Sequence, residues 1–432
     1  MTALSDTSLR AIVAGLRRGE FSSLQLTEAC LARIAEREPA IGAWAWCDPE
    51  AAKSRARAAD AAPAAGLLHG IPFGIKDIMH TAGIPTGMGS IIFAGFVPET
   101  SAAAVTRIEA AGGFVLGKTV TAELAYFSPG KTRNPWNLTH TPGGSSSGSA
   151  AAVAAGMVPA ALGTQTNGSV IRPAAYCGVV GFKPSAGRIP GKGIQPFSVT
   201  LDQLGLFVRE VMDAGLLAAV LTGDAALSEV QPLAQPPRLL AVRSPVWQEA
   251  DAAQQQMFEA NLVALRAAGA ELVERELPAA FAEAHAVHRT IMAFEAAKQL
   301  VPLHVEHAEQ MSEPLRQIIA EGLGIDSTSY RAALARRLEL RLALAEFLGE
   351  ADAIVTPPAT GEAPKTLAHT GSPSFCTIWS LAGVPALSFP VGLGPQGLPL
   401  GLQLVGGLNE DAGLLSAAAW CAEHIGFRER PA

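Results

Sequence analysis

The chain is organised around residues 142–173, which read PGGSSSGSAAAVAAGMVPAALGTQTNGSVIRP. Two Gly/Ser clusters, at 143–149 and 163–169, lie on either side of an alanine-rich segment and a short apolar run. Glycine lets backbone N–H groups approach a ligand closely, and serine supplies hydroxyl groups for nucleophilic attack or proton relay. Two polar loops joined by apolar structure therefore indicate a functional site.

Strand and helix patterns alternate around this stretch. Residues 146–156 are small and apolar and predict a buried helix, and residues 157–162 predict a strand that ends at the second Gly/Ser cluster. The neighbouring predictions are a strand running into a loop at 68–77 (LHGIPFGIKD), a helix at 101–112 with Ser101 as its N-cap, and strands at 114–116 and 179–182.

Helical periodicity dominates both the N-terminal region and the region before the C-terminal tail. The sequence predicts helices at 5–37, with a break near Gly19–Ser23 and an end at Pro39, and at 48–60, 210–222 and across 248–348. The tail predicts strands at 353–355, 386–391 and 401–405, then a helix at 410–424. Strand patterns near both ends predict one α/β sheet built from both ends, with residues 240–350 as an inserted helical cap.

Composition indicates a globular protein with a large core, because 49% of residues are hydrophobic and 16% are charged. The formal net charge of −7, without a dense Lys/Arg run, predicts no binding to nucleic acid or to an anionic membrane. The five cysteines form no CxxC pair, so neither disulfides nor a metal site is expected, and a cytoplasmic location fits best. No signal peptide or membrane span is expected either.

Residues 112–119, GGFVLGKT, match the phosphate-binding pattern G-x-x-x-x-G-K-[ST] in their letters. That loop requires a strand before the first glycine and a helix after the last residue. Here a predicted helix precedes the pattern, and the central Phe-Val-Leu favours a buried strand. We therefore expect a helix-to-strand turn at this place and no nucleotide site.

A second pattern, GSSSG at 144–148, matches the nucleophile elbow G-x-S-x-G centred on Ser146. The elbow needs a strand directly before it and a later acid and histidine to complete a triad. The preceding residues, NPWNLTHTP, are a poor strand, although the triad stays an alternative because histidines follow. We expect each of these histidines to be an exposed or capping residue that is dispensable for chemistry: His285, His288, His304, His307, His369 and His424.

A serine that is activated without histidine needs another base, and a lysine kept neutral by burial can serve. Lys76 is the candidate, because it follows the apolar run LHGIPFGI, which would carry its side chain into a partly dry site. The alternative is that Lys76 pairs with Asp77 or another acid at a surface turn. Spacing alone leaves both interpretations open.

These segments closely resemble the amidase signature family. The resemblance rests on LHGIPFGIKD (68–77), GKT with the following Glu (117–123), NPWN (134–137), PGGSSSGSAAAVAAG (142–156), GTQTNGSVIRPAAYCGVVGFKPS (163–185), LDQLGLFVREVMD (201–213), and LAGVPALSFPVG and GLPLGLQLVG near the C-terminus. The resemblance implies an α/β fold in which helices cover both faces of a large mixed β-sheet. It also implies a single amidase domain over 1–432, with N-terminal helices (1–60), a catalytic core (61–225), a helical substrate-shaping region (226–350) and a C-terminal return to the core sheet (351–432).

Carried over position by position, the Ser–Ser–Lys triad of the family falls on Ser169 as nucleophile, Ser145 as bridging serine in a cis-peptide conformation, and Lys76 as base. The resemblance implies an oxyanion hole and no metal or organic cofactor. The backbone N–H groups of this hole would come from Thr166, Asn167, Gly168 and Ser169.

The sequence departs from the commonest family pattern at three positions near the triad. Gln165 stands where Asp is frequent, and Asn167 and Ser147 stand where Gly is frequent. Asn tolerates positive φ better than most residues, so position 167 can keep the loop shape. These differences leave the triad intact and leave the substrate class open.

Arg172 lies three residues after the nucleophile position and has two candidate roles. It could hold the loop through an ion pair or backbone contacts, for which the fork of the guanidinium is well suited. The sequence GTQT-x-GSVIRPAAYCG is also similar to that of the malonamidase branch of the family, in which this arginine binds a substrate carboxylate. In that case the substrate would be a small acid amide.

The resemblance implies a stand-alone enzyme that hydrolyses a small amide C–N bond through a seryl acyl-enzyme. Carbamates or urea derivatives are alternative substrates for the same triad. A function of a different class is the glutaminase-type subunit of an amidotransferase complex, in which ammonia passes to a partner. The expected partners are therefore a small-molecule amide or carbamate and, as one assembly left open, a second copy of the chain in a homodimer.

Overall fold

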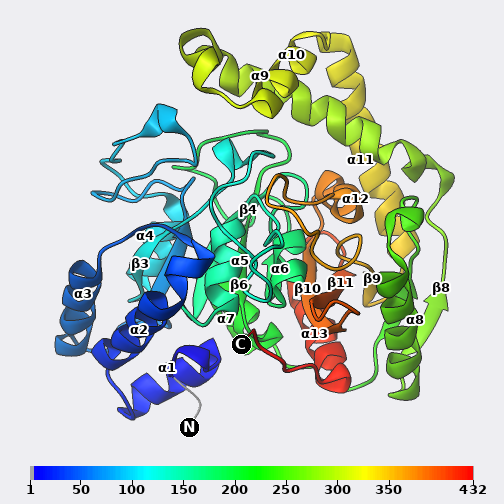
Figure 1. Cartoon of the computed structure of the whole chain (residues 1–432). Coiled ribbons are helices and arrows are strands. Elements are labelled where there is room, and N and C mark those ends of the chain that lie inside the picture. Colours follow the sequence, from blue (N-terminus) through cyan, green and yellow to red (C-terminus); the bar gives the residue numbers. More distant parts are fainter. Residues whose placement is uncertain (1–3, 432) are drawn as a thin grey trace.

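An 11-stranded β-sheet forms the centre of the protein (Figure 1). The computed structural model describes residues 4–431. The strands are β1 (Trp44–Cys47), β2 (Pro72–Lys76), β3 (Phe114–Thr119), β4 (Ala160–Gln165), β5 (Val180–Lys183), β6 (Gln203–Val208), β7 (Arg238–Ala241), β8 (Glu271–Glu274), β9 (Ala353–Thr356), β10 (Ala386–Leu393) and β11 (Pro399–Val405).

The sheet is mixed, with the order β1-β3-β2-β4-β6-β5-β10-β11-β9-β7-β8. β2 lies parallel between β3 and β4, and β7 lies parallel between β8 and β9. The other neighbouring pairs in the described chain are antiparallel. The predicted α/β class with one sheet built from both ends of the chain is therefore confirmed.

Helices cover both faces of this sheet. Every residue of β2, β3, β4 and β6 is buried, which requires cover on both sides because successive side chains of a strand point to opposite faces. The α-helices are α1 (Leu9–Arg18), α2 (Ser23–Ile41), α3 (Pro49–Ala61), α4 (Ala103–Ala110), α5 (Ser147–Ala154), α6 (Ile171–Cys177), α7 (Val211–Thr222), α8 (Ala252–Ala267), α9 (Ala284–His307), α10 (Glu313–Leu323), α11 (Ser327–Leu348), α12 (Ser374–Ala382) and α13 (Asp411–Ile425). Short 3₁₀ turns span Leu4–Asp6, Ile91–Phe93, Glu123–Ala125, Ala225–Glu229, Trp247–Glu249, Ala279–Glu283 and Ala308–Gln310.

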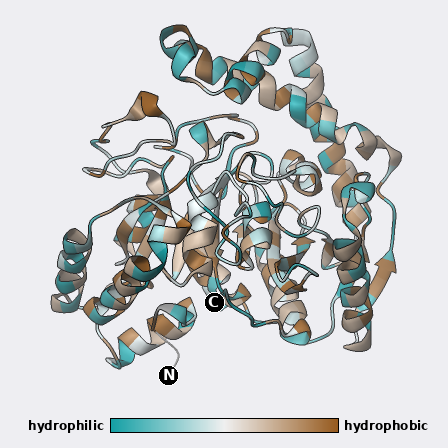
Figure 2. Cartoon of the chain, viewed as in Figure 1, coloured by the Kyte–Doolittle hydropathy of each residue, from teal (hydrophilic) through white to brown (hydrophobic). Residues whose placement is uncertain are grey.

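Local capping explains where the N-terminal helices begin. The Ser8 side chain caps α1, Ser22 forms a capping box with Gln25 at the start of α2, and Asp48 caps α3. In Figure 2, α2 and α3 carry both hydrophilic and hydrophobic segments, as expected for helices with one face on the core and one in water.

Two predicted helix boundaries are wrong. α2 continues through Pro39 to Ile41, because a proline in the last turn removes only one backbone donor and the helix ends instead at Gly42, which has a left-handed conformation. α4 begins at Ala103 rather than near Ser101. The Ser101 hydroxyl accepts a hydrogen bond from the N–H of Ala82 (3.0 Å) and so fastens a neighbouring loop instead of capping the helix.

The expectation that residues 240–350 form an inserted helical cap is correct only for α9–α11. β7 and β8 belong to the central sheet, and α8 packs against β10, β11 and α13. α10 and α11 each pack on α9, both α9 and α11 contact α12, and the three helices extend beyond the edge of the sheet in Figure 1. The short strands β7 and β8 were missed because they join the sheet through β9, which lies more than a hundred residues further along the chain than β7.

The topology brings the two Gly/Ser clusters to one edge of the sheet. β2 and β4 are parallel neighbours, with Ile75 opposite Leu162, so their carboxyl ends, Lys76 and Gln165, meet at the same edge. The first cluster leads into α5, which packs on both strands, and the second cluster links β4 to α6. This edge carries the candidate site.

Candidate active site

Lys76 ends β2 and points at two hydroxyl groups. Its Nζ lies 2.7 Å from Ser145 Oγ and 2.7 Å from Thr164 Oγ1. Thr164 belongs to β4, the parallel neighbour of β2, while Ser145 comes from the first Gly/Ser cluster. The lysine therefore joins the two clusters through hydroxyl contacts.

The side chain of Lys76 is completely buried. Burial holds the pKa of its ammonium group well below the ordinary lysine value, and the charge of Arg172 lowers it further, against an opposing effect of Asp202. Among the described residues no carboxylate forms an ion pair with Lys76; Asp77 instead pairs with Lys118 at 3.3 Å. The surface ion pair that the sequence left open for Lys76 is therefore wrong.

Ser145 follows a cis peptide bond between Gly144 and Ser145. Ser145 is 2% exposed, and the carbonyl of Gly144 accepts a hydrogen bond from Nη2 of Arg172 (2.6 Å). The conformation implied by the family resemblance is thus present at this position.

Two other serines of the first cluster, Ser146 and Ser149, connect α5 to β4. The hydroxyl of Ser146 is bonded to the backbone of Thr164, at 3.2 Å to its oxygen and 3.3 Å to its nitrogen. Ser149 Oγ donates to the carbonyl of Leu162 (2.8 Å). Ser146 is fully buried and begins no strand–elbow–helix turn, because the segment before it is a loop. The elbow alternative therefore has no structural support.

Ser169 and Ser145 line the same small cavity, of about 30 Å³. Ser169 is half-buried, and the loop 166–169 that precedes α6 forms much of the cavity wall. Within residues 4–431, no backbone carbonyl accepts a hydrogen bond from the N–H of Asn167, Gly168 or Ser169. A Cβ at Gly168 would lie 2.9 Å from Arg172 Nη1 and 3.0 Å from Pro373 Cβ, so a larger residue there would require these two side chains to shift.

Arg172 is 3% exposed and holds backbone carbonyls. Its Nε donates to the carbonyl of Thr370 (2.8 Å), and its Nη2 donates to the carbonyl of Gly144 and to the hydroxyl of Thr370 (3.1 Å). The remaining nitrogen, Nη1, is buried and has no partner in the described chain. Arg172 also lines the small cavity, so the loop-holding role is present and one donor is left over.

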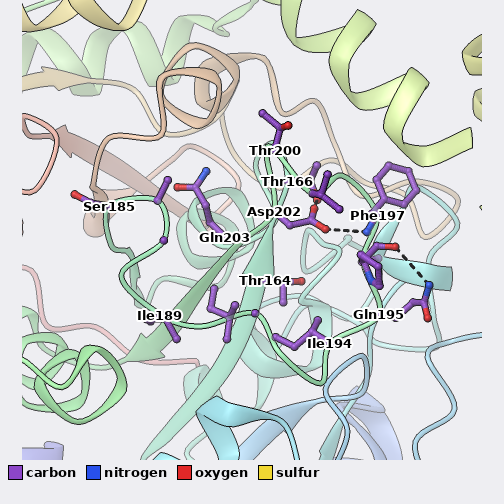
Figure 3. Close-up of a pocket in the computed structure, with 17 residues that line it drawn as sticks. Thr164, Thr166, Ser185, Ile189, Ile194, Gln195, Phe197, Thr200, Asp202 and Gln203 are labelled. Atoms are coloured by element: carbon purple, nitrogen blue, oxygen red, sulfur yellow. Dashed lines mark hydrogen bonds between the residues drawn. The ribbon is translucent and has the colours of Figure 1, made fainter. Parts of the chain in front are cut away.

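A larger cavity of about 350 Å³ borders the small one and shares Ala125, Thr166 and Phe197 with it. Figure 3 shows Asp202 inside this cavity, directed at the backbone of Phe197. Asp202 also accepts a hydrogen bond from Thr166 Oγ1 (2.5 Å). Burial raises the pKa of Asp202 to about 6. Mostly apolar side chains and threonines line the rest, so this space suits the uncharged body of a small molecule.

The phosphate-binding pattern at 112–119 is a helix-to-strand turn, as predicted. Residues 114–119 form β3, and Lys118 is buried where it donates to the carbonyl of Met79 (2.8 Å) and to Thr86 Oγ1 (2.6 Å). Burial lowers the pKa of Lys118 to about 8. This lysine therefore holds the loop after β2.

Several residues that touch the site could not be predicted from the sequence. Thr164 contacts Lys76, Asp202 contacts Thr166, and Ser380 on α12 contacts the carbonyl of Asn167. The expectation that His288 is exposed or capping is wrong, because it is 1% exposed and its Nε2 lies 3.1 Å from the carbonyl of Thr166. Thr164 stands inside the second Gly/Ser cluster and Asp202 inside the segment LDQLGLFVREVMD, whereas His288 and Ser380 lie outside the segments that the sequence singles out as functional.

Comparison with known proteins identifies the family. A family model described as Amidase matches residues 25–415. A glutamyl-tRNA(Gln) amidotransferase subunit from Anaeromyxobacter sp. (strain K) is 37% identical over 98% of this chain and 97% of its own length. A solved amidase structure superposes with a TM-score of 0.88 at 32% identity, covering 97% of this chain and 100% of the other. Peptide amidase from Stenotrophomonas maltophilia superposes with a TM-score of 0.84 at 28% identity, covering 99% and 98%.

The chain therefore belongs to the amidase signature family and is an enzyme that hydrolyses carbon–nitrogen bonds of amides. No group of three or more His, Cys, Asp or Glu side chains in residues 4–431 could hold a metal ion. Nor is any helix in that part of the chain long and apolar enough to cross a membrane.

Proposed function

We propose that this chain hydrolyses a small amide through a seryl acyl-enzyme, with Ser169 as nucleophile, Ser145 as proton relay and Lys76 as base. The observation that carries the proposal is the environment of Lys76, which is fully buried, has no acidic partner in the described chain and contacts two hydroxyl groups. Such burial favours the neutral amine. If Thr164 Oγ1 accepts one N–H of that amine, the nitrogen lone pair is free to accept the hydroxyl proton of Ser145.

During acylation the proton of Ser169 moves through Ser145 to Lys76. Ser169 Oγ attacks the carbonyl carbon, its proton passes to Ser145 Oγ, and the Ser145 proton passes to Nζ of Lys76. When the C–N bond breaks, the proton on Lys76 returns through Ser145 to the leaving nitrogen. Water then attacks the ester by the same path, which releases the acid and restores Ser169 and neutral Lys76.

The oxyanion of each tetrahedral intermediate would be bound by backbone N–H groups of residues 166–169. Support comes from the amides of Asn167, Gly168 and Ser169, which bind no backbone carbonyl of the described chain and lie in the wall of the cavity that also holds Ser145. Amides that are fixed before the reaction stabilise the developing charge without reorganisation. The small volume of this cavity favours a short acyl group, and the larger cavity next to it is available to the remainder of the substrate.

A second candidate function is the amide-hydrolysing subunit of a complex that passes ammonia to a partner. This function is favoured because the chain aligns over almost the whole length of relatives that are named as glutamyl-tRNA(Gln) amidotransferase subunits. The purified chain alone, tested on small acid amides, aryl amides, carbamates, ureas and glutamine, distinguishes the two. Turnover without a partner supports the stand-alone amidase, whereas glutamine hydrolysis that begins only with a partner supports the role in a complex. The mass of the active species measured in the same experiment tests the homodimer.

The unpaired Nη1 of Arg172 suggests a substrate with a carboxylate. If this donor binds that carboxylate, Arg172→Met should lower kcat/KM for malonamate about tenfold or more relative to propionamide, because hydrogen bonds to charged groups contribute ~1.5–3 kcal/mol. The measurement is the ratio of the two kcat/KM values in wild type and variant.

Thr370→Val is the matched control for this prediction. It removes one contact of Arg172 and disturbs the same loop without removing the charge, so it should affect both amides alike. Equal losses for the two amides in Arg172→Met, or a wild type without preference for malonamate, would leave Arg172 with its loop-holding role only.

A further inference from the structure

Two side chains from outside the Gly/Ser clusters hold consecutive carbonyls of the loop 166–169. Nε2 of His288, on α9, lies 3.1 Å from the carbonyl oxygen of Thr166. The hydroxyl of Ser380, on α12, donates to the carbonyl oxygen of Asn167. Both side chains follow the loop by more than a hundred residues in the sequence, so these contacts come from the tertiary fold rather than from the local chain.

Holding these carbonyls fixes the direction of two N–H groups. A trans peptide is planar, and its C=O and N–H point in opposite directions. The carbonyl of Thr166 shares a peptide with the N–H of Asn167, and the carbonyl of Asn167 shares one with the N–H of Gly168. A contact that anchors each carbonyl away from the cavity lined by Ser145 and Ser169 would direct the paired N–H toward that cavity.

Gln165 determines which way the Ser380 hydroxyl points. Its Oε1 accepts hydrogen bonds from the N–H groups of Val170 (2.8 Å) and Ile171 (3.0 Å), which fixes the orientation of the amide. Its Nε2 consequently faces Ser380 and donates to Oγ (2.9 Å). Since Ser380 Oγ receives that proton, its own proton is free for the carbonyl of Asn167.

The hydrogen-bond partner of His288 likewise determines its tautomer. A carbonyl oxygen only accepts, so the proton of the ring lies on Nε2. Burial lowers the pKa of His288 to about 4, against the opposing effect of its hydrogen bond to the carbonyl of Thr166, and the charges of Arg289 and Arg337 act in the same direction as burial. His288 is thus a neutral donor to Thr166 at physiological pH.

We propose that His288, and Ser380 oriented by Gln165, are positioning residues of the oxyanion hole that hold the Asn167 and Gly168 amides in the direction of the reacting carbonyl. This rests on the proposed function, in which Ser169 is acylated. In this proposal α9 and α12 support catalysis by holding the loop 166–169, and neither helix contacts the substrate through these two residues. It also gives Gln165 a role that an acid at this position would not have, because a carboxylate would accept the Ser380 proton and withdraw it from Asn167.

The test uses the full-length chain and a short alkyl fluorophosphonate as probe, so it needs no knowledge of the natural substrate. Ser169 Oγ forms a bond to phosphorus, the P–F bond breaks, fluoride leaves, and the serine proton passes through Ser145 to Lys76. The P=O oxygen occupies the oxyanion hole during this step. The rate of labelling, followed by intact mass, therefore reports on the direction of the two amides.

Loss of either donor should slow labelling on the order of 10-fold, because removal of a whole oxyanion donor costs about 100-fold to 1000-fold. The affected variants are His288→Leu and Ser380→Ala, while His288→Gln, which retains an N–H donor at similar reach, should label near the wild-type rate. Gln165→Glu should be slowed like Ser380→Ala, and the double variant should be no slower than either, since both lose the same bond.

Two matched controls separate positioning from general disturbance. His285→Leu changes a histidine one turn earlier on α9 that contacts the carbonyl of Ser374 instead. Thr377→Val changes a hydroxyl one turn earlier on α12 that contacts the side chain of Asn167, not its carbonyl. Both should label at nearly the wild-type rate.

The possible results distinguish a failure of the proposed function from a failure of the positioning inference alone. A wild type that is not labelled on Ser169, or a Ser169→Ala variant labelled equally fast, overturns the proposed function and this inference with it. Normal labelling of Ser169 in the wild type, combined with wild-type rates in Ser380→Ala and Gln165→Glu, overturns the inference alone. A wild-type rate in folded His288→Leu removes His288 from the inference. If that variant does not fold, Ser380→Ala and Gln165→Glu still decide the inference for the Asn167 carbonyl.

Discussion

Replacement of Lys76 by methionine should lower kcat for amide hydrolysis by about 1000-fold or more, because it removes the base that contacts Ser145. General bases contribute roughly 100-fold to 10,000-fold, and a base that also activates the nucleophile lies at the upper end of that range. The variant should fold normally, since methionine fills similar volume and removes a buried amine. Steady-state hydrolysis and thermal unfolding of the same preparation check both parts.

Lys118→Met is the matched control, because Lys118 is an equally buried lysine on the adjacent strand. Its amine holds the carbonyl of Met79 and pairs with Asp77. Its loss should therefore lower the melting temperature while the folded fraction keeps its kcat. A Lys76→Met variant with wild-type kcat would remove Lys76 from the mechanism.

The pH profile adds an independent check on the same residue. The active form of Lys76 is the neutral amine, so activity is present above the pKa of Lys76 in the folded protein and falls as pH drops through it. Burial holds that pKa well below the ordinary lysine value, so the acid limb of kcat/KM should lie well below the pH at which an exposed lysine titrates. An acid limb at the ordinary lysine pKa would contradict the assignment.

Replacement of Ser145 by alanine should lower kcat on the order of 100-fold to 1000-fold, because it breaks the hydroxyl path between Lys76 and Ser169. Formation of the acyl-enzyme and its hydrolysis should both slow, since each step uses the same relay. Rapid-mixing measurement of the two steps with an activated ester tests this expectation.

Ser146→Ala provides the control for Ser145, because the two serines are adjacent and both buried. The Ser146 hydroxyl contacts the backbone of Thr164. Its loss should reduce the free energy of unfolding and leave kcat of the folded protein nearly unchanged. A larger catalytic loss in Ser146→Ala than in Ser145→Ala would transfer the relay role to Ser146.

Seven of the eleven strands could be predicted from the sequence because they are short apolar segments bounded by turn residues, whereas β1 and the central strand β6 were not predicted. β2 and β4 were found in this way, although the strand predicted at 157–162 lies at 160–165 in the structure. β7 and β8 could not be found, since they are short and depend on pairing with β9. Helical periodicity in the neighbouring residues led to the prediction of a helical region there.

In the site, too, residues within local sequence patterns could be predicted, whereas residues that reach the site through tertiary packing could not. The patterns themselves found both Gly/Ser clusters and Lys76, and the family resemblance supplied the roles of Ser145 and Ser169. His288 and Ser380 could not be predicted, because each contacts a backbone carbonyl, which leaves no trace in residue types. Their contacts span 122 and 213 residues of sequence and exist only once α9 and α12 are packed on the core.

Acylation of Ser169 is the central claim, and peptide mapping after acid quench tests it most directly. With p-nitrophenyl acetate, whose leaving group departs readily, we expect acylation to be faster than hydrolysis of the acyl-enzyme, so that the acyl-enzyme accumulates with a burst of p-nitrophenolate. We expect one acetyl group on Ser169 and none in Ser169→Ala. A burst with acetyl on Ser145 or Ser146, or an acetylated Ser169→Ala protein that still turns over, would contradict the claim.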